Sequence, residues 1–296
     1  MVDPDPPAAL LLLKRKGART TAEVPPDVRR LISTGALETV NLSEWLVVDH
    51  ELLVTTTFDA LGWGTWTPHV IDTLASLPKP TSVKKVAAVG THLAAHYAET
   101  PRSLDKLIAA LVRHRSDVVR SWVPYLIGCS KTINLREKLA RVRPLAADPN
   151  MGVREAAWSG VRASIASEVL RSIELLCETG WVTDPDPRVR RFASEATRPR
   201  GVWCAHIQML KDTPVLGLPI LEPLKTDSAK YVQDSVGNWL NDASKSQPDW
   251  TRDVCDRWIR EIKSTTSASA FDPVTKAIAA AATARIVRRG LRTLDK

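Results

Sequence analysis

The stretch DPDPRVRRFASEA, residues 184–196, carries the pattern from which the fold can be predicted. Its two Asp-Pro pairs predict a turn, in which an aspartate caps the next helix and proline is tolerated in the first helical turn. The apolar residues after the turn recur at the spacing of one helix face; they are Val189, Phe192, Ala193 and Ala196. The stretch therefore predicts a turn and a half-buried helix whose first valine enters the core.

The same pattern recurs along the chain. Segments that open on Asp or Ser-Asp and lead into a helix beginning on valine start near Ser116, Asp148, Asp184, Asp227 and Asp272. Their valines, Val119, Val153, Val189, Val232 and Val274, are 34, 36, 43 and 42 residues apart. A period of roughly 35–45 residues is typical of HEAT-type helical repeats, which bury their apolar faces by stacking. We therefore predict an all-α fold, a HEAT-like repeat solenoid with a concave basic groove. The segment SVKKVAAVGTHLAAHYAE, 82–99, is expected to be one more degenerate repeat.

Composition and charge suit one globular domain with an anionic partner. The chain has 296 residues, 44% of them hydrophobic, and its 41 Lys and Arg against 33 Asp and Glu give a net charge of +8. Such a balance favours nucleic acid over membrane as a partner. We expect residues 1–25 to form a flexible basic tail and residues 26–296 to form a single repeat domain.

Several classes of protein are disfavoured by the sequence. The four cysteines, Cys129, Cys177, Cys204 and Cys255, form no C-x-x-C pair, so we expect neither a metal site nor a cofactor. Unpaired cysteines suit a reducing cytoplasm. The apolar run AALLLL, 8–13, precedes its basic cluster, the reverse of a signal peptide, and no segment approaches the ~20 apolar residues of a membrane span. A cytoplasmic monomer without membrane contact is expected.

Polar stripes accompany the apolar faces of three consecutive repeats. In the helix after Asp184, residues Arg191, Glu195 and Arg198 lie at i, i+4 and i+7 and so share one face. The neighbouring repeats have comparable stripes, formed by Glu155, Ser159 and Arg162 with Trp158 adjoining, and by Asn238, Asn241 and Asp242. We expect the three stripes to line one face of the solenoid.

The arginines allow two interpretations. Arg120, Arg154 and Arg190 follow a repeat valine directly, and such arginines commonly pair with an acidic residue of the next repeat. The surplus arginines of RVRRFASEATRPRGVW, 188–203, are Arg191, Arg198 and Arg200, and these are candidates for binding phosphates. A carboxylate among them is either pinned by arginine or available to stabilise a cation, and the spacing leaves both readings open.

Three segments resemble the AlkC branch of the AlkC/AlkD-type DNA glycosylases, which excise alkylated bases. RRFASEATRPRGVW, 190–203, is similar to that branch's RR-x-A-S-E-G-T-R-P-R-x-x-W. YVQDSVGNWLNDASKSQP, 231–248, is similar to Y-V-R-x-S-V-x-N-x-L-N-D-x-x-K, and GALETVNLSEWLVVDHELL, 35–53, is similar to I-E-T-x-N-L-x-E-x-L-A-x-D. The resemblance runs from about residue 26 to about residue 262 and keeps the family's order of motifs.

The resemblance implies a HEAT-like solenoid that grips duplex DNA. It also implies removal of cationic bases such as 3-methyladenine without flipping them into a deep pocket. Glu195, Trp203 and Asp242 fall on positions that resemble the family's active-site residues.

The chain departs from the family pattern in one repeat. The family's third carboxylate lies in an S-E-F-A-I-R-P stretch, whereas this chain has REAAWSGVRASI, 154–165. When Arg162 is matched to the family's arginine, Trp158 takes the place of the glutamate, and Glu155, one turn earlier, is the candidate substitute.

The chemistry that the resemblance implies fits these residue types. An alkylated purine is cationic and leaves without a general acid, so carboxylates are needed only to stabilise the oxocarbenium ion and orient water. Tryptophan offers a π-face to a cationic base. We expect Glu195, Asp242 and Glu155 to be catalytic. The expected contacts to the lesion and DNA are Trp203, Arg191, Arg198, Arg200, Arg162, Asn238, Asn241 and Trp158.

Three hypotheses of function follow. The first is a monofunctional alkylpurine DNA glycosylase of the 3-methyladenine type, acting on double-stranded DNA that contains alkylated bases. The second is a non-catalytic HEAT-repeat protein that binds damaged or distorted DNA, which the altered region around Trp158 favours. The third is a HEAT scaffold for a protein partner.

Overall fold

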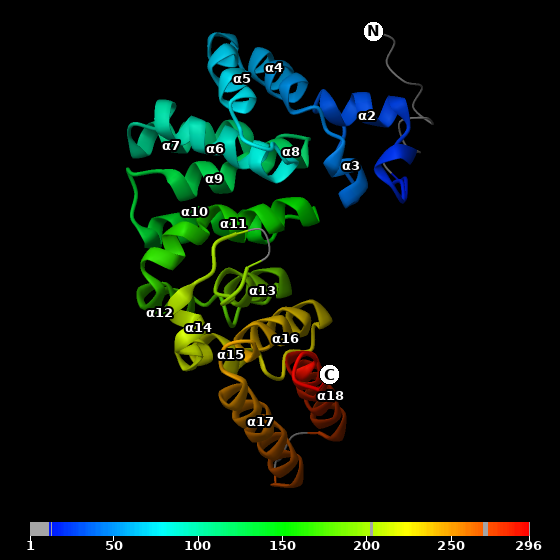
Figure 1. Cartoon of the computed structure of the whole chain (residues 1–296), viewed down its shortest axis with the longest axis vertical. Coiled ribbons are helices and arrows are strands. Elements are labelled where there is room, and N and C mark those ends of the chain that lie inside the picture. Colours follow the sequence, from blue (N-terminus) through cyan, green and yellow to red (C-terminus); the bar gives the residue numbers. More distant parts are fainter. Residues whose placement is uncertain (1–11, 13, 202–203, 269–271, 296) are drawn as a thin grey trace. The chain divides into compact units, whose positions relative to one another are not determined.

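The computed structural model describes residues 12, 14–201, 204–268 and 272–295. The chain divides into two compact units, Met1–Gly160 and Val161–Lys296. Within the described ranges every regular element is an α-helix or a 3₁₀-helix, and none is a strand (Figure 1). This confirms the prediction of an all-α, HEAT-like repeat fold. The single domain over 26–296 and the concave groove stay predictions.

The first unit contains short helices followed by the first repeats. In chain order its elements are η1 (Thr21–Glu23), α2 (Pro26–Ser33), α3 (Leu42–Leu46), α4 (His50–Ala60), η2 (Gly64–Trp66), α5 (Thr67–Ala75), α6 (Ser82–Tyr97), α7 (Pro101–Leu111), α8 (Asp117–Arg120), α9 (Trp122–Cys129) and α10 (Leu135–Ala146). The division between the units falls within α11 (Met151–Ser167).

The second unit begins inside α11 and continues through the predicted site. Its elements are α12 (Val169–Glu178), α13 (Pro187–Ala196), α14 (Gln208–Asp212), η3 (Pro214–Gly217), α15 (Leu218–Leu224), α16 (Lys230–Ser244), α17 (Pro248–Ala268) and α18 (Pro273–Leu291). No described helix combines the length and the apolarity that a membrane crossing requires.

Part of the expected N-terminal tail contacts the first unit. The Arg15 guanidinium donates to both carboxylate oxygens of Glu44, over 2.8 and 2.6 Å, and the Glu44 side chain is buried. Residues 1–11 and 13 lie outside the described residues, and for them the flexible tail stays a prediction.

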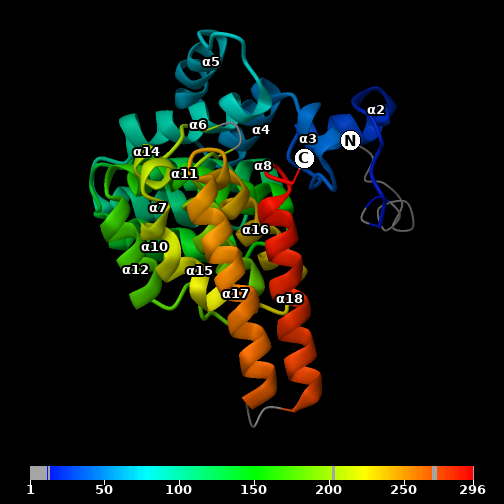
Figure 2. The same ribbon diagram turned by 60° about the horizontal axis from the view of Figure 1, so that its bottom comes forward.

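Four of the five repeat valines are core residues, as predicted, because Val119, Val153, Val189 and Val232 are all buried. The prediction is wrong for Val274, which is 66% exposed. Figure 2 shows α17 and α18 side by side, extending beyond α16, so that among the described helices only α17 lies beside the first turns of α18. The buried positions of α18 come later in the helix, at Ala282, Thr283, Ile286 and Gly290.

The repeat arginines share one backbone contact. In each case Nη1 donates to the carbonyls six and five residues earlier, in the loop before the arginine's own helix. Arg120 donates to His114 and Arg115 (2.8 and 3.0 Å), Arg154 to Asp148 and Pro149 (2.7 and 2.8 Å), and Arg190 to Asp184 and Pro185 (2.7 and 3.1 Å).

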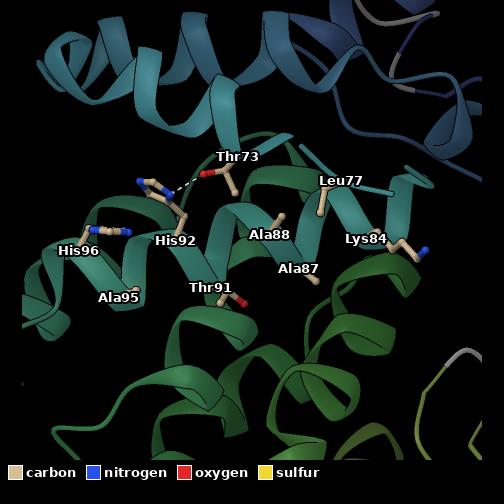
Figure 3. A pocket seen from close by; sticks show the side chains of 9 residues that line it. All are labelled: Thr73, Leu77, Lys84, Ala87, Ala88, Thr91, His92, Ala95 and His96. Atoms are coloured by element: carbon tan, nitrogen blue, oxygen red, sulfur yellow. Dashed lines mark hydrogen bonds between the residues drawn. The ribbon is translucent and has the colours of Figure 1, made fainter. Parts of the chain in front are cut away.

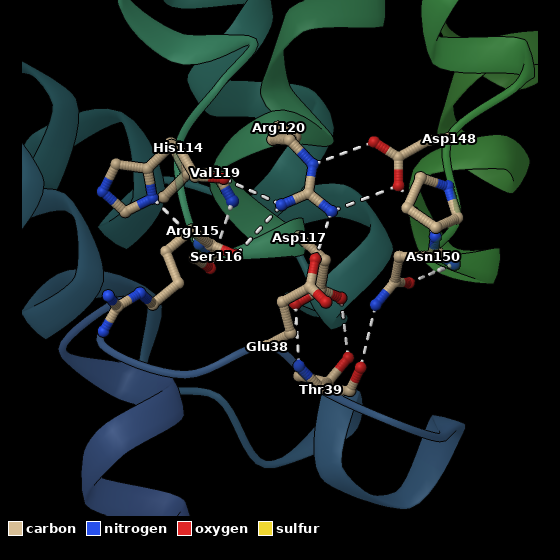
Figure 4. A network of polar contacts seen from close by, with 12 residues as sticks. Glu38, Thr39, His114, Arg115, Ser116, Asp117, Val119, Arg120, Asp148 and Asn150 are labelled. Atoms are coloured by element: carbon tan, nitrogen blue, oxygen red, sulfur yellow. Dashed lines mark hydrogen bonds and ion pairs between the residues drawn. The ribbon is translucent and has the colours of Figure 1, made fainter. Parts of the chain in front are cut away.

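Two of these arginines also bind the aspartate that opens the next repeat. Arg120 donates to Asp148 over 2.9 and 3.1 Å, as Figure 4 shows, and Arg190 donates to Asp227 over 2.5 and 2.9 Å. The structural interpretation of Arg120 and Arg190 is therefore confirmed. The expectation that an opening aspartate caps the next helix is wrong for Asp227, because α16 has Ala229 at its N-cap. Asp227 Oδ1 instead accepts from both Arg190 and the Ala229 amide, over 2.9 Å each, and so closes the loop before α16.

Candidate functional site: two carboxylates on one arginine

Helices α13 and α16 lie against each other in the second unit and carry the two carboxylates of the predicted site (Figure 1). Two hydrogen bonds fix their register: Ser194 Oγ donates to Ser235 Oγ over 2.8 Å, and Trp239 Nε1 donates to the Thr197 carbonyl over 2.9 Å. The helices are amphipathic for the reason the sequence indicates, with Val189 and Val232 in the core.

Arg198 joins the two carboxylates. Its Nη1 donates to Glu195 Oε1 over 2.7 Å, and its Nε donates to Asp242 Oδ2 over 2.8 Å. All three side chains are buried, at 8%, 4% and 3% exposure for Arg198, Glu195 and Asp242. Buried charges are tolerated only when they are paired and hydrogen-bonded, a condition that this arrangement meets. The spacing allowed a carboxylate that is paired with arginine or one that is available to a cation. The structure shows both carboxylates paired with Arg198.

Glu195 is held as an anion. Burial by itself would raise the pKa of its carboxyl, but the charges of Arg191 and Arg198 and a 2.6 Å hydrogen bond from Ser235 outweigh burial and hold the pKa below its usual value. Because the carboxylate is ionised at neutral pH and its environment is low in water, it is suited to stabilising a nearby positive charge.

The remaining arginines of the stripe lie around this centre. Arg191 is 3.5 Å from Glu195 Oε2 and also stacks over the Tyr231 ring, 4.4 Å from its centroid. Arg200 donates to the Asp242 carbonyl over 3.2 Å and to Ser246 Oγ over 2.6 Å. The structure thus brings Arg191 and Arg198 to the carboxylates and Arg200 to the backbone of Asp242.

Arg162 supports the backbone beneath the site. It is buried and donates to the carbonyls of Ala196, Arg198 and Ala205 over 2.9, 2.6 and 3.1 Å. Gly201 packs against this guanidinium: a Cβ there would come within 3.1 Å of Arg162 Cζ and 2.1 Å of Cys204 Sγ. Arg162 therefore fixes the segment on which Arg198 lies, a positioning role that the sequence pattern alone did not indicate.

The two asparagines point elsewhere. Asn238 accepts from Arg289 Nε over 2.9 Å, and the buried Asn241 donates to the Gly290 carbonyl and to Thr293 Oγ1 over 3.3 and 2.8 Å. Both therefore hold the end of α18 and not the carboxylate centre. The stripe read from spacing contains residues of two faces, because Asn241 and Asp242 are adjacent and point in different directions around α16.

The third candidate carboxylate lies in the other unit. Glu155 accepts from Trp158 Nε1 over 2.8 Å, and Trp158 is buried. These two residues contact each other, and their roles in a site stay predictions. Trp203 lies outside the described residues.

Two contacts of the site helices could not be predicted from the sequence: that of Ser235 with Glu195, and that of Arg289 of α18 with Asn238 of α16. A serine has no distinctive spacing, and its contact with Glu195 exists only because α13 and α16 pack side by side. The basic run ARIVRRGLR, 284–292, is evident in the sequence. That it packs against α16 and contacts Asn238 could not be predicted from the residues of α16.

A separate pocket of about 510 Å³ lies on α5 and α6 of the first unit. Figure 3 shows its walls, which are mainly small side chains around the hydrogen bond between Thr73 and His92 Nδ1, 2.8 Å long. It contains none of the predicted site residues and no carboxylate.

Comparisons with known proteins bear on this arrangement. No protein-family model matches the chain. The uncharacterized protein YhaZ of Bacillus subtilis (strain 168) is 47% identical over 78 residues, which are 26% of this chain and 22% of YhaZ. The structure of Pseudomonas fluorescens alkylpurine DNA glycosylase AlkC bound to DNA containing an abasic site analog matches 95% of this chain and 66% of the AlkC chain. The TM-score of that match is 0.63 at 22% identity.

The chain therefore has the helical-repeat fold of AlkC, and the relationship that the three motifs predicted is confirmed at the level of the fold. The chain spans less than two thirds of AlkC and about a fifth of YhaZ.

Proposed function

We propose that this chain is a monofunctional DNA glycosylase that removes cationic alkylated bases, of the 3-methyladenine type, from duplex DNA. The observation that carries the proposal is the pair of buried carboxylates, Glu195 and Asp242, held by one arginine on a fold that an alkylpurine DNA glycosylase also has. A pair of oriented anions is the requirement of a reaction that passes through a sugar cation.

The proposed reaction begins with a base that is already cationic. The bond between C1′ and the base nitrogen breaks, and its electron pair neutralises the leaving base, so no general acid is required. The oxocarbenium ion that remains is stabilised by the Glu195 and Asp242 carboxylates. Water then attacks C1′ and gives its proton to one of these carboxylates, leaving an abasic site.

Each supporting residue has a role in the proposal. Arg198 orients both carboxylates, and Ser235 donates to the second oxygen of Glu195, Oε2. Arg191 and Arg200 border the centre and are proposed to face the phosphates of the DNA. Trp203 is proposed to lie against the lesion, where its π-face suits a cation.

Release of 3-methyladenine or 7-methylguanine from methylated duplex DNA tests the proposal. Chromatography of the free bases should show release above the spontaneous rate with the chain, and none above it with the Glu195→Gln, Asp242→Asn double variant. An intact chain that releases no base at all overturns the proposal.

A second candidate function is binding of damaged DNA without excision. Trp158 favours it, because a buried tryptophan, which also holds Glu155, stands where the resembling family has its third carboxylate. Under this candidate the chain binds methylated duplex with a steep salt dependence and releases no base.

A further inference from the structure

Helix α18 carries a concentration of positive charge. Its sequence, Pro273–Leu291, contains Lys276, Arg285, Arg288 and Arg289 and no acidic residue, and Arg292 follows at the C-cap. Every other α-helix that lies wholly in the described part of the second unit, from α12 to α17, contains at least one Asp or Glu.

The end of α18 is held tightly against the site helix α16. A Cβ on Gly237 of α16 would lie 2.8 Å from Arg289 Cβ, and a Cβ on Gly290 of α18 would lie 2.9 Å from Leu240 Cβ. The two helices therefore approach closely at both glycines. This close contact fixes which residues of α16 lie opposite Arg289 and its neighbours in α18.

Hydrogen bonds join the same segment to the stretch of α16 that contains Asp242. Arg289 donates to Asn238, and Gly290 and Thr293 accept from Asn241, the residue before Asp242. Partial burial, followed by the charge of neighbouring Arg289, lowers the pKa of Arg292. The charges of Asp242 and Arg198 have smaller effects on the same pKa.

The four arginines at the end of α18 differ in their partners. Arg285 and Arg289 share the carboxylate of Asp234, at 2.8 and 3.4 Å. Arg288 and Arg292 are exposed, and neither forms an ion pair with a carboxylate in the described part of the chain. They are four residues apart and so project from the same side of the helix end.

We propose that Arg288 and Arg292 bind backbone phosphates of the DNA next to the Glu195–Asp242 centre. The inference rests on the proposed function and adds to it a contact surface that lies outside the family-like motifs. Carboxylates repel the phosphates of the strand they must approach, and exposed arginines beside them offset that repulsion.

Salt dependence of DNA binding tests the inference. The chain and its variants are titrated into a fluorescently labelled, undamaged duplex at several salt concentrations, and the slope of log K against log salt is measured by anisotropy. Each lost phosphate contact reduces the slope by about 1, so Arg288→Ala/Arg292→Ala should reduce it by about 2. The double variant to lysine should restore it, because lysine retains the charge.

The control is Arg171→Ala/Arg260→Ala, which removes two exposed arginines from α12 and α17 of the same unit; of these, Arg171 is paired with Glu174 and Glu178. Circular dichroism and melting temperature establish that each variant is folded. An unchanged slope in the Arg288/Arg292 variant, or an equal reduction in the control, overturns the inference.

Excision assays on methylated duplex separate the two failures. If the chain excises bases and the slope of the Arg288/Arg292 variant is unchanged, only the inference fails. If the chain excises nothing and the slope falls by about 2, only the glycosylase proposal fails. A chain that binds no duplex overturns both.

Discussion

At the scale of the residue, the proposed chemistry depends on how Arg198 is shared. One guanidinium donates to Glu195 and Asp242 on two different helices, and a serine completes the shell of Glu195. A carboxylate held in this way costs little reorganisation when a cation develops nearby. Because of these shared contacts, we expect a change at any of the three residues to affect stability as well as the proposed activity.

Glu195→Gln and Asp242→Asn preserve shape and remove charge. We expect each to slow base excision by ~10²-fold or more, the scale of a lost electrostatic stabiliser. DNA affinity should hold or rise, because a negative charge has left the site. Single-turnover excision and anisotropy measure the two quantities. Glu261→Gln, in a surface ion pair with Lys225 and Arg257, is the control and should excise at the parent rate. Folded variants that both excise at the parent rate would place the chemistry elsewhere, with Glu155 next to be tested.

Arg198→Ala should act mainly on stability. It leaves two buried carboxylates without their shared partner, a loss of about 3–5 kcal/mol when a buried ion pair is broken on one side. Arg200→Ala, which removes one hydrogen bond to a carbonyl and one to a serine, should cost about 1–2 kcal/mol. Urea unfolding compares the two. Equal, small losses would show that Arg198 is not the support of the site.

At the scale of the element, polar contacts fasten short segments to repeat loops. Asp117, at the start of α8, accepts from the amide and hydroxyl of Thr39 over 2.9 and 2.6 Å, and Asn150 donates to the Thr39 carbonyl over 2.8 Å (Figure 4). The carboxyl is fully buried. Burial outweighs the hydrogen bonds from Thr39 and raises its pKa to about 6.

This raised pKa predicts a pH dependence of stability. Because the folded chain binds the proton of Asp117 more tightly than the unfolded chain, the contribution is fully present below the unfolded pKa near 3.8 and is lost as pH rises through about 6. Asp117→Asn removes that component. The difference in unfolding free energy between parent and variant should shift by up to about 3 kcal/mol between low and neutral pH, always in favour of the parent at the lower pH.

Urea unfolding at a series of pH values measures this shift. Asp105→Asn is the control, since Asp105 forms an exposed ion pair with Arg141 and should show little change. Parallel pH profiles for the parent and Asp117→Asn would contradict the prediction.

The helices also show which features of the fold could be predicted from the sequence. Helices α13 and α16 and their buried valines followed from periodicity, because a spacing of 3.6 residues is a local property. Val274 did not, since its exposure depends on how far α18 extends past its neighbours. The facing directions of Asn241 and Asp242 required the packed partner of α16, which no spacing encodes.

At the scale of the whole molecule, the net charge of +8 favours an anionic partner. The salt dependence of binding separates a DNA partner from a protein partner. If duplex DNA is the partner, log K should fall linearly with log salt, with a slope of about −0.9 for each phosphate neutralised. Anisotropy over a range of salt concentrations measures it. A scaffold for a protein would show weak, shallow binding to DNA, and that result would favour the third hypothesis.

The repeat arginines also set rules for exchanging repeats. The three repeat arginines, Arg120, Arg154 and Arg190, each donate to the carbonyl six residues earlier. This separation is constant although the spacing between repeats varies. Two of them also grip an aspartate that belongs to the following repeat. Length is therefore free to vary after each helix but not between its opening loop and its arginine. A transplanted repeat should therefore keep the spacing between its opening loop and its arginine, and the repeat that follows it should open on an aspartate that can accept from that arginine.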